Sequence, residues 1–183
     1  GVLSGDRSLL GRPMGRIIDP LNQMGGAIVG TADGTRAPLH IGHSVPVCIP
    51  HTNTISSAQI KSAQLIASIR VGTTILEPSR SRDHTERMLR AMGATINVGL
   101  TGPITMAPTG NLCALNQIIP ADFSSAAFWI VAATIVPGSD LTLPRVGLNP
   151  TRTGLIDILR AMGANVEVTD VDDTMEPFGT IRV

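Results

Sequence analysis

Hydrophobic residues recur along the chain with the spacings of helices and strands. Between residues 153 and 162 the apolar side chains are Leu155, Ile156, Ile158, Leu159 and Met162, a spacing that places them on one face of a helix. A second helix is predicted at 85–92. Short extended segments, in which apolar residues alternate or run together, are predicted at 73–76, 94–98, 141–143 and 165–168.

Two other segments are predicted to form helices that are apolar on nearly every side. The first follows the serines at 56 and 57 and carries Ile60, Leu65, Ile66 and Ile69. The second, at 126–136, is the longest apolar stretch, and it is shorter than the about 20 residues that a membrane span needs. A helix without a polar face is typically surrounded by protein, so both helices are expected to be buried.

An internal repeat organises these elements. The sequence Leu-Arg-Ala-Met-Gly-Ala occurs at 89–94 and again at 159–164, with a weaker copy at 21–27. The methionines of the three copies are 68 and 70 positions apart, and the Ser-Ser-Ala triplets at 56–58 and 124–126 are also 68 positions apart. Because two independent markers share one period, the chain is predicted to consist of similar structural units of about 70 residues.

Each unit is predicted to have the same order of elements. A strand leads through a polar loop into a helix that ends at a glycine, Gly93 or Gly163, in the left-handed conformation. A second strand follows at once, and further strands lead to the next apolar helix. The fold class is therefore α+β, and the chain holds only about two and a half units.

Composition and charge exclude several classes of function. Fourteen Lys and Arg residues balance 14 Asp and Glu residues, so the net charge is zero and no basic stripe points to nucleic acid or to a membrane surface. Aromatic residues make up 2% of the chain and offer nucleotide bases little to stack on. A local pair of arginines in a neutral protein is still compatible with a small anionic ligand. The chain begins without Met and without a signal-peptide pattern, which favours an internal portion of a larger protein.

The cysteines and histidines indicate neither a disulfide nor a metal site. Cys48 and Cys113 have apolar neighbours typical of strands and no second Cys nearby, so they are expected to be inert thiols in a reducing compartment. His40 and His43 have no carboxylate or Cys at the spacing of a metal ligand, so no metal site is expected there.

Five motifs are spread over nearly the whole chain. They are Gly5-Asp6-Arg7-Ser8-Leu9 with Arg12-Pro13-Met14-Gly15-Arg16, Ser57-Ala58-Gln59-Ile60-Lys61-Ser62-Ala63, Ser81-Arg82-Asp83-His84-Thr85-Glu86, Asp122-Phe123-Ser124-Ser125-Ala126-Ala127-Phe128 and Asn149-Pro150-Thr151-Arg152-Thr153-Gly154. In this order they resemble the motifs of the 5-enolpyruvylshikimate-3-phosphate (EPSP) synthase family. Ala121 is a departure, since it stands where the family usually has Gly.

The resemblance implies a fold and a reaction. The family fold has two similar domains, each of three βαβαββ repeats, in the inverse α/β arrangement of the enolpyruvyl transferases. Residues 1–119 are expected to be part of the lower domain, which binds shikimate 3-phosphate, and residues 120–183 to begin the upper domain. The family transfers the enolpyruvyl group of phosphoenolpyruvate to the 5-hydroxyl of shikimate 3-phosphate and releases phosphate.

The resemblance also implies the biological setting. The reaction belongs to the shikimate pathway of aromatic amino-acid biosynthesis, needs no metal or organic cofactor, and is the target of glyphosate. The full-length parent is expected to be a cytoplasmic monomer, or a plastid protein if it comes from a plant, with no nucleic-acid or membrane partner.

Arg12 is the residue expected to bind the carboxylate of phosphoenolpyruvate, and the resemblance implies a catalytic role for it. A guanidinium matches a carboxylate with two parallel hydrogen bonds. Pro13 next to it suits the first turn of a helix. Arg16, one turn later, is expected to form an ion pair at the surface or between elements.

Ser57, Ala58 and Gln59 begin the first apolar helix. Exposed N–H groups and hydroxyls at a helix amino terminus can hold a phosphate group, and the resemblance places shikimate 3-phosphate here. Ala58 replaces the second Ser of many relatives, as it does in some glyphosate-tolerant ones. The alternative interpretation is that Ser56 or Ser57 only caps the helix. Lys61, in the first turns, is interpreted as a possible structural cation.

Arg82 lies in the loop before the next helix, and the resemblance implies that it contacts the substrate phosphate. Asp83 and Glu86 are expected to pair with arginines or to cap that helix together with Thr85. His84 is interpreted as structural. Ser124 and Ser125, at the start of the second apolar helix, are expected to cap it.

Two alternative functions stay open at this point. One is the related UDP-N-acetylglucosamine enolpyruvyl transferase, which depends on a reactive Cys in a loop of its own. The other is a non-catalytic fragment that only binds ligand. The family's amino-terminal Lys and Arg and its later Asp, Glu and Lys set have no counterpart in this chain, so the isolated chain is expected to be inactive.

Overall fold

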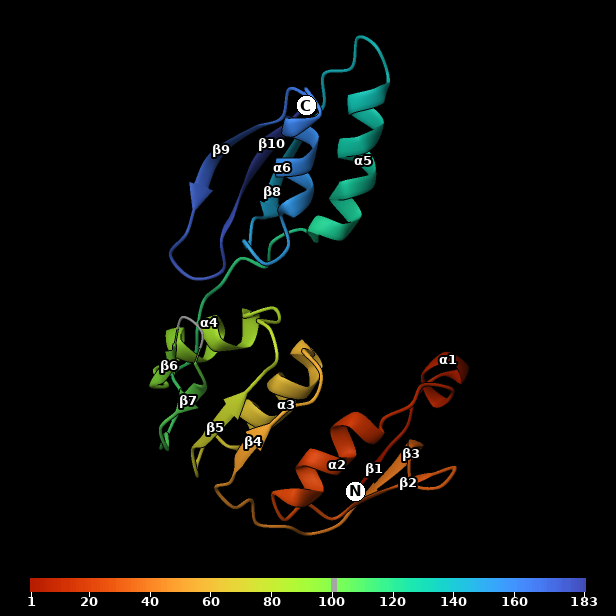
Figure 1. The fold of residues 1–183 in the computed structure, drawn as a ribbon, viewed down its shortest axis with the longest axis vertical. Coiled ribbons are helices and arrows are strands. Elements are labelled where there is room, and N and C mark those ends of the chain that lie inside the picture. The colour runs from red at the N-terminus through yellow and green to blue at the C-terminus, as the bar shows by residue number, and fades with distance from the viewer. Residues whose placement is uncertain (100–101) are drawn as a thin grey trace. The chain divides into compact units, whose positions relative to one another are not determined.

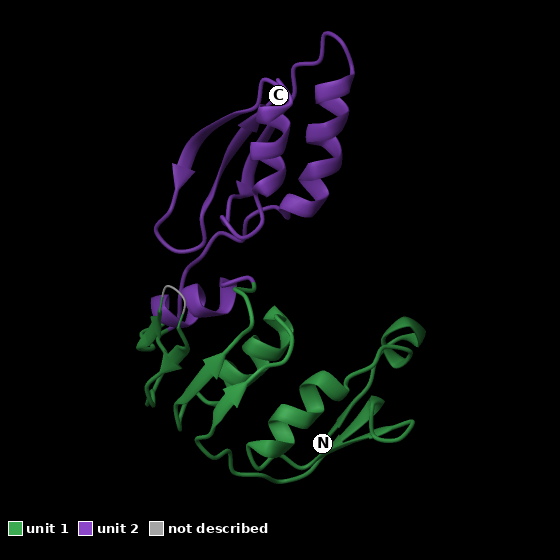
Figure 2. Cartoon of the chain, viewed as in Figure 1, with its two compact units in different colours: residues 1–81, 92–113 green, residues 82–91, 114–183 purple. Residues whose placement is uncertain are grey.

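The computed structural model describes residues 1–99 and 102–183, which form two compact units (Figure 1, Figure 2). The first unit comprises Gly1–Ser81 and Met92–Cys113, and the second comprises Arg82–Ala91 and Ala114–Val183. The division does not follow chain order, because the ten residues from Arg82 to Ala91 group with the second unit.

The first unit contains two sheets and three helices within its described residues. Its elements are β1 (Val2–Leu3), α1 (Arg7–Leu10), α2 (Gly15–Gln23), β2 (Ile28–Thr31), β3 (Arg36–Ile41), β4 (Pro50–Thr52), α3 (Ala58–Ala67), β5 (Thr73–Leu76), β6 (Ile96–Val98) and β7 (Ile104–Met106). One sheet is antiparallel with the order β1-β3-β2. The other has the order β4-β5-β7-β6, and β4 pairs with β5 in parallel. Because parallel neighbours need a crossover, α3 connects β4 to β5.

The second unit contains one antiparallel sheet, against which two of its three helices pack. Its elements are α4 (His84–Ala91), α5 (Phe123–Ile135), β8 (Thr142–Gly147), α6 (Gly154–Ala161), β9 (Glu167–Asp172) and β10 (Phe178–Arg182), with the strand order β8-β10-β9. Figure 1 shows α5 and α6 side by side along the sheet. The core joins both helices to the strands, and its buried members are Phe123, Ala126, Ile130, Val146, Ile156, Leu159, Val166 and Ile181.

The repeat predicted from the sequence is confirmed in the structure. The helices predicted at 85–92 and 153–162 are α4 and α6, and each of their ends differs from the predicted end by one residue. Each copy of the repeated motif has, directly after its methionine, a glycine with a left-handed backbone, with φ of 90° at Gly25, 99° at Gly93 and 92° at Gly163. A side chain is strained in this conformation, which is why glycine stands there in all three copies.

The strand predictions are correct in kind and differ in extent. The strand at 73–76 is β5 without change, and β6 begins two residues later than predicted. β8 and β9 each have six residues, because both pair with β10 along most of its length. Cross-strand pairing therefore sets the strand ends, and the local sequence pattern does not contain that information.

The expectation that both apolar helices are surrounded by protein is wrong for this chain. In α5, Phe128 is 80% and Trp129 62% exposed, whereas Ile130 is fully buried. In α3, Ile66 is 58% exposed, whereas Leu65 is fully buried. The described residues therefore leave one apolar face of α5 and the Ile66 side of α3 exposed.

Two further expectations about local structure are wrong. Cys48 and Cys113 are exposed and lie in loops, so their apolar neighbours do not form strands. Pro13 does not begin a helix: it forms an isolated bridge with Arg36, and α2 starts only at Gly15. The amide that follows it, at Met14, donates to the carbonyl of Thr35, directly before the start of β3.

No helix within residues 1–99 and 102–183 has the length and apolar character to span a membrane.

A buried ion pair lies beneath α3. The ammonium Nζ of Lys61 is 3.3 Å from Oε2 of Glu77, and the two side chains are 1% and 0% exposed. Lys61 Nζ also donates to the carbonyl of Ser81 at 3.3 Å, and Ser81 Oγ donates to Glu77 Oε1 at 2.6 Å. This geometry supports the interpretation of Lys61 as a structural cation.

Replacement of Lys61 by Ala should therefore destabilise the chain strongly. It leaves the Glu77 carboxylate buried without its cation, which costs about 3–5 kcal/mol of unfolding free energy. The measurement is urea unfolding followed by circular dichroism. The double variant Lys61→Met with Glu77→Leu is the control and should recover most of the loss. A single variant as stable as the original chain would contradict the prediction.

Candidate functional site

The amino terminus of α3 carries the first three residues predicted to bind shikimate 3-phosphate, Ser57, Ala58 and Gln59. Ser57 is the residue before the helix, with an extended backbone at φ −139° and ψ 115°. Within the described residues its side chain makes no capping hydrogen bond. The alternative that this serine hydroxyl caps the helix is therefore wrong. Because the Ser57 side chain does not cap the helix, the first-turn N–H groups and this hydroxyl are the groups at α3 to which an anion would be expected to bind.

The neighbouring Ser56 has a different role. Its Oγ donates to the carbonyl of Ser79 at 2.7 Å and accepts from the Ser79 amide at 2.9 Å. Ser56 therefore does not cap α3 either, and it ties the start of this helix to the loop that follows β5. Further along α3, Gln64 and Asn53 exchange two amide hydrogen bonds of 2.9 and 3.0 Å, which join the helix to the end of β4.

Arg12 lies just after α1 and is exposed. Its backbone amide donates to the carbonyl of Leu9 at 3.1 Å, which holds the turn at the helix end. In the part of the chain that the structure describes, its guanidinium has no hydrogen bond or ion pair. The binding of a carboxylate by Arg12, which the resemblance implies, stays a prediction. Arg16 is also exposed, and the ion pair expected for it is not among the contacts of the described residues.

The first unit also has a cavity that the sequence pattern does not indicate. It has a volume of about 300 Å³ and lies between α2, β4 and α3, with Arg16, Asp19, His51, Asn53 and Gln64 among its lining residues. Burial lowers the pKa of the His51 imidazole, which favours its neutral form. None of the predicted site residues lines this cavity.

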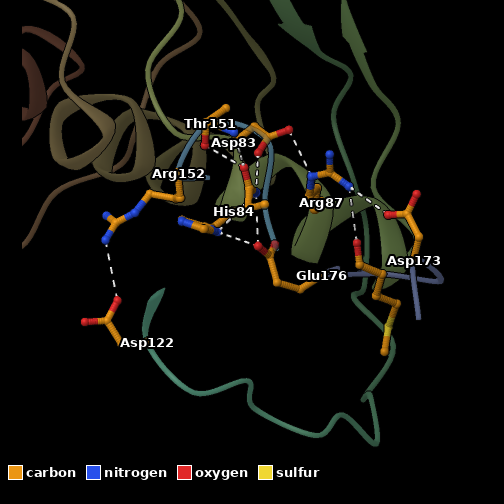
Figure 3. Close-up of polar contacts among 10 residues, drawn as sticks. Asp83, His84, Arg87, Asp122, Thr151, Arg152, Asp173 and Glu176 are labelled. Atoms are coloured by element: carbon orange, nitrogen blue, oxygen red, sulfur yellow. Dashed lines mark hydrogen bonds and ion pairs between the residues drawn. The ribbon is translucent and has the colours of Figure 1, made fainter. Parts of the chain in front are cut away.

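The second unit has a polar cluster centred on Asn149, shown in Figure 3. Asn149 is 2% exposed, and its Nδ2 donates to Asp83 Oδ1 at 2.7 Å and to Glu176 Oε1 at 3.0 Å. Its Oδ1 accepts hydrogen bonds from the amide N–H of Thr151 at 2.9 Å and from the hydroxyl of the same residue at 2.5 Å. Both polar atoms of this buried amide are therefore satisfied.

Asp83 and His84 are held by other contacts in the same cluster. Oδ2 of Asp83 is 2.9 Å from Nε of Arg87, one turn later on α4, and His84 Nδ1 is 2.7 Å from Glu176 Oε1. The predicted pairing of Asp83 with an arginine is confirmed, and these contacts support the structural interpretation of His84. Burial of the Asp83 carboxyl raises its pKa, but the hydrogen bond from Asn149 and the charge of Arg87 outweigh burial and lower that pKa overall.

Asp122 caps α5, so the expectation that Ser124 and Ser125 cap it is wrong. Asp122 Oδ1 accepts from the Ser124 amide at 3.1 Å, and Oδ2 accepts from the Ser125 hydroxyl at 3.3 Å. Arg152 donates to Oδ1 of Asp122 at 3.4 Å and to the hydroxyl of Ser124. These contacts, led by the Ser124 amide, lower the pKa of Asp122. A cavity of about 250 Å³ lies beside this pair, with Asn149 and Glu176 in its lining.

Arg82 directly precedes Asp83 and is exposed. Among the residues described, none forms a hydrogen bond or ion pair with its guanidinium. Arg82 belongs to the second unit, whereas the residues at the start of α3 belong to the first. The sequence analysis assigns no role to Glu176 or Asn149. Their contacts with Asp83 and His84 join segments that are far apart in the sequence, and a local sequence pattern does not reveal such contacts.

Within residues 1–99 and 102–183, no group of three His, Cys, Asp or Glu side chains is arranged to hold a metal ion.

The lowered pKa of Asp83 predicts a dependence of stability on pH. Because the folded pKa lies below the ordinary value of 3.8, the unfolded chain binds a proton first. Asp83 therefore stabilises the fold above that value and loses its contribution as pH falls through the folded pKa. In urea unfolding from neutral to strongly acid pH, the stability difference between the original chain and Asp83→Asn should shrink. A difference that does not change with pH would contradict the prediction.

Comparisons with known proteins agree over the whole chain. The family model described as EPSP synthase (3-phosphoshikimate 1-carboxyvinyltransferase) matches residues 1–180. Similar curated proteins include the 3-phosphoshikimate 1-carboxyvinyltransferases of Geobacter sp. strain M21, 48% identical, and Synechococcus sp. strain WH7803, 46% identical. In both cases the alignment covers 100% of this chain and 43% of the relative, so the chain spans less than half the length of the proteins it matches.

Solved structures lead to the same family. The EPSP synthase from Acinetobacter baumannii matches with a TM-score of 0.88 and 41% identity, over 100% of this chain and 42% of that one. The enolpyruvyl transferase NikO from Streptomyces tendae matches with a TM-score of 0.63 at 19% identity, over 93% of this chain and 42% of that one, which shows the shared fold alone. The repeat, the order of the motifs and these matches together show that the chain belongs to the EPSP synthase family.

Proposed function

We propose that this chain is part of an enzyme that transfers the enolpyruvyl group from phosphoenolpyruvate to the 5-hydroxyl of shikimate 3-phosphate and releases phosphate. The observation that carries the proposal is a set of anion-binding groups without protein partners among the described residues. They are the uncapped amino terminus of α3 with the Ser57 hydroxyl, and the guanidinium groups of Arg82 and Arg12. Both substrates are anions, which such groups bind.

Each group has a proposed role. Ser57, Ala58, Gln59 and Arg82 bind shikimate 3-phosphate, with the helix N–H groups and the guanidinium directed at its phosphate. Arg12 binds the carboxylate of phosphoenolpyruvate and stabilises charge during the reaction. Phosphoenolpyruvate is protonated at C3, and the 5-hydroxyl oxygen gives up its proton as it attacks C2, so a tetrahedral intermediate forms. Its carbon–oxygen bond to phosphate then breaks while a proton leaves the C3 methyl group, which restores the double bond of the enolpyruvyl group and releases phosphate. Donors fixed in advance favour this step, because they need no reorganisation as charge develops.

The assignment of domains is part of the same proposal. Residues 1–119 belong to the lower domain, and residues 120–183 begin the upper domain. This boundary rests on the resemblance, which places the passage between the two domains near Asp122, and it differs from the bounds of the two compact units. The cytoplasmic location and the monomeric state of the parent stay predictions.

The alternative function as a UDP-N-acetylglucosamine enolpyruvyl transferase depends on a reactive Cys. Cys48 and Cys113 are exposed in loops, so their packing does not argue against it. The choice of shikimate 3-phosphate is supported by the motifs at 57–63 and 81–86 and by the names of the relatives. Transferase activity of the parent that survives labelling by a thiol reagent is the expected result, and its loss would favour the alternative.

Calorimetric titration tests the substrate site. The chain should bind shikimate 3-phosphate more tightly than plain shikimate, because only the former carries the phosphate. Ser57→Ala and Arg82→Ala should each weaken that binding, by about 1.5–3 kcal/mol for loss of a hydrogen bond to a charged group. Arg70→Ala is the matched control: it also removes one positive charge, but from an exposed residue after the other end of α3. Equal affinity for both ligands would overturn the proposed site.

The isolated chain should show no measurable turnover. It spans 43% of the length of its relatives, and the remaining cationic and proton-transferring residues of the family have no counterpart in it. Release of inorganic phosphate from a mixture of both substrates measures this directly, with the full-length parent as the positive control. Turnover by the chain at an ordinary enzymatic rate would contradict the prediction.

A further inference from the structure

The contacts of Asp83 affect whether its carboxylate can pair with the guanidinium of the neighbouring Arg82. The two residues have opposite charges and are adjacent in the chain, so a free Asp83 carboxylate would be a nearby partner for the Arg82 guanidinium. In the structure both carboxylate oxygens already have other partners. Oδ1 accepts from Asn149 Nδ2 at 2.7 Å, and Oδ2 is 2.9 Å from Arg87 Nε.

The Asn149 side chain is itself held firmly. It is 2% exposed, its second N–H donates to Glu176 at 3.0 Å, and its oxygen accepts from Thr151. Rotation of this side chain away from Asp83 would leave buried polar atoms without partners, which is costly. The amide therefore occupies Asp83 Oδ1 persistently. The hydrogen bond from Asn149 and the charge of Arg87 lower the pKa of Asp83 in spite of its burial, which is consistent with a carboxylate at this position.

We propose that Asn149 is a positioning residue for substrate binding: it holds the Asp83 carboxylate and so keeps the Arg82 guanidinium available to the phosphate of the substrate. This inference rests on the proposed function, because it takes Arg82 as a phosphate ligand. It adds a residue from the Asn149–Gly154 motif that acts through Asp83 and does not itself touch the substrate. The phosphate then does not have to displace an internal carboxylate before it binds.

The test is a set of calorimetric titrations with shikimate 3-phosphate, with plain shikimate as the second ligand. Asn149→Ala frees Asp83 Oδ1 and should weaken shikimate 3-phosphate binding on the order of tenfold, as loss of a supporting residue around a site commonly does. Binding of plain shikimate, which lacks the phosphate, should not change. Thr151→Val is the matched control: it removes a hydroxyl bonded to the other end of the same amide and leaves the contact with Asp83 in place.

A rescue variant separates this role from a merely structural one. In Asp83→Asn no carboxylate is available to capture Arg82, so adding Asn149→Ala should not weaken shikimate 3-phosphate binding further. If Asn149→Ala instead weakened binding by disturbing the structure, shikimate 3-phosphate would bind the double variant less tightly than it binds Asp83→Asn alone. Thermal melting confirms that each variant is folded. If Asn149→Ala does not fold, Asn149→Ser takes its place. The serine side chain is shorter than that of asparagine, so its hydroxyl cannot reach Asp83 as the amide does.

The outcomes distinguish this inference from the proposed function. If Arg82→Ala weakens binding of shikimate 3-phosphate but the Asn149 variant does not, the inference is wrong and the proposed function stands. The inference is also wrong if the Asn149 variant weakens the binding of both ligands equally. It is wrong, too, if the Asn149 variant still weakens shikimate 3-phosphate binding when Asp83 is replaced by Asn. If the original chain does not bind shikimate 3-phosphate, or Arg82→Ala has no effect, the proposed site fails and the inference fails with it.

Discussion

The hydrogen bonds of one buried amide organise the polar part of the second unit. Asn149 lies between the carboxylates of Asp83 and Glu176, and its two N–H groups satisfy one oxygen of each. A buried amide can hold two carboxylates in this way because it donates two hydrogen bonds without adding charge. Through this contact the Arg82–Ala91 segment is tied to the loops after β8 and β9, which is consistent with its grouping in the second unit although it lies between two segments of the first.

In the first unit, an ion pair and the hydrogen bonds of one serine hold the start of α3 in place. The buried pair of Lys61 and Glu77 and the bonds of Ser56 with Ser79 fix the helix start against the loop after β5. These contacts use Ser56 and leave Ser57 outside the network, which is what a helix terminus that binds an anion requires. Of two adjacent serines that the sequence alone does not distinguish, one thus has structural hydrogen bonds and the other has the proposed binding role.

The exposed apolar faces of α3 and α5 accord with the extent of the chain. The relatives are more than twice as long as the matched region. On α5, Phe128 and Trp129 are exposed, whereas Ile130 is buried in the core that joins this helix to α6 and the sheet.

The sequence by itself determined the repeat, the family, the α+β class and the positions of α4 and α6. These features depend on local periodicity, on motif order and on glycines such as Gly93 that need a left-handed backbone, and all of these can be read along the chain. Only the tertiary structure decided that Asp122 caps α5, that Pro13 pairs with a strand, and that Asn149 joins Asp83 to Glu176. Burial and hydrogen bonding depend on which distant segments come into contact, and local sequence patterns do not contain that information.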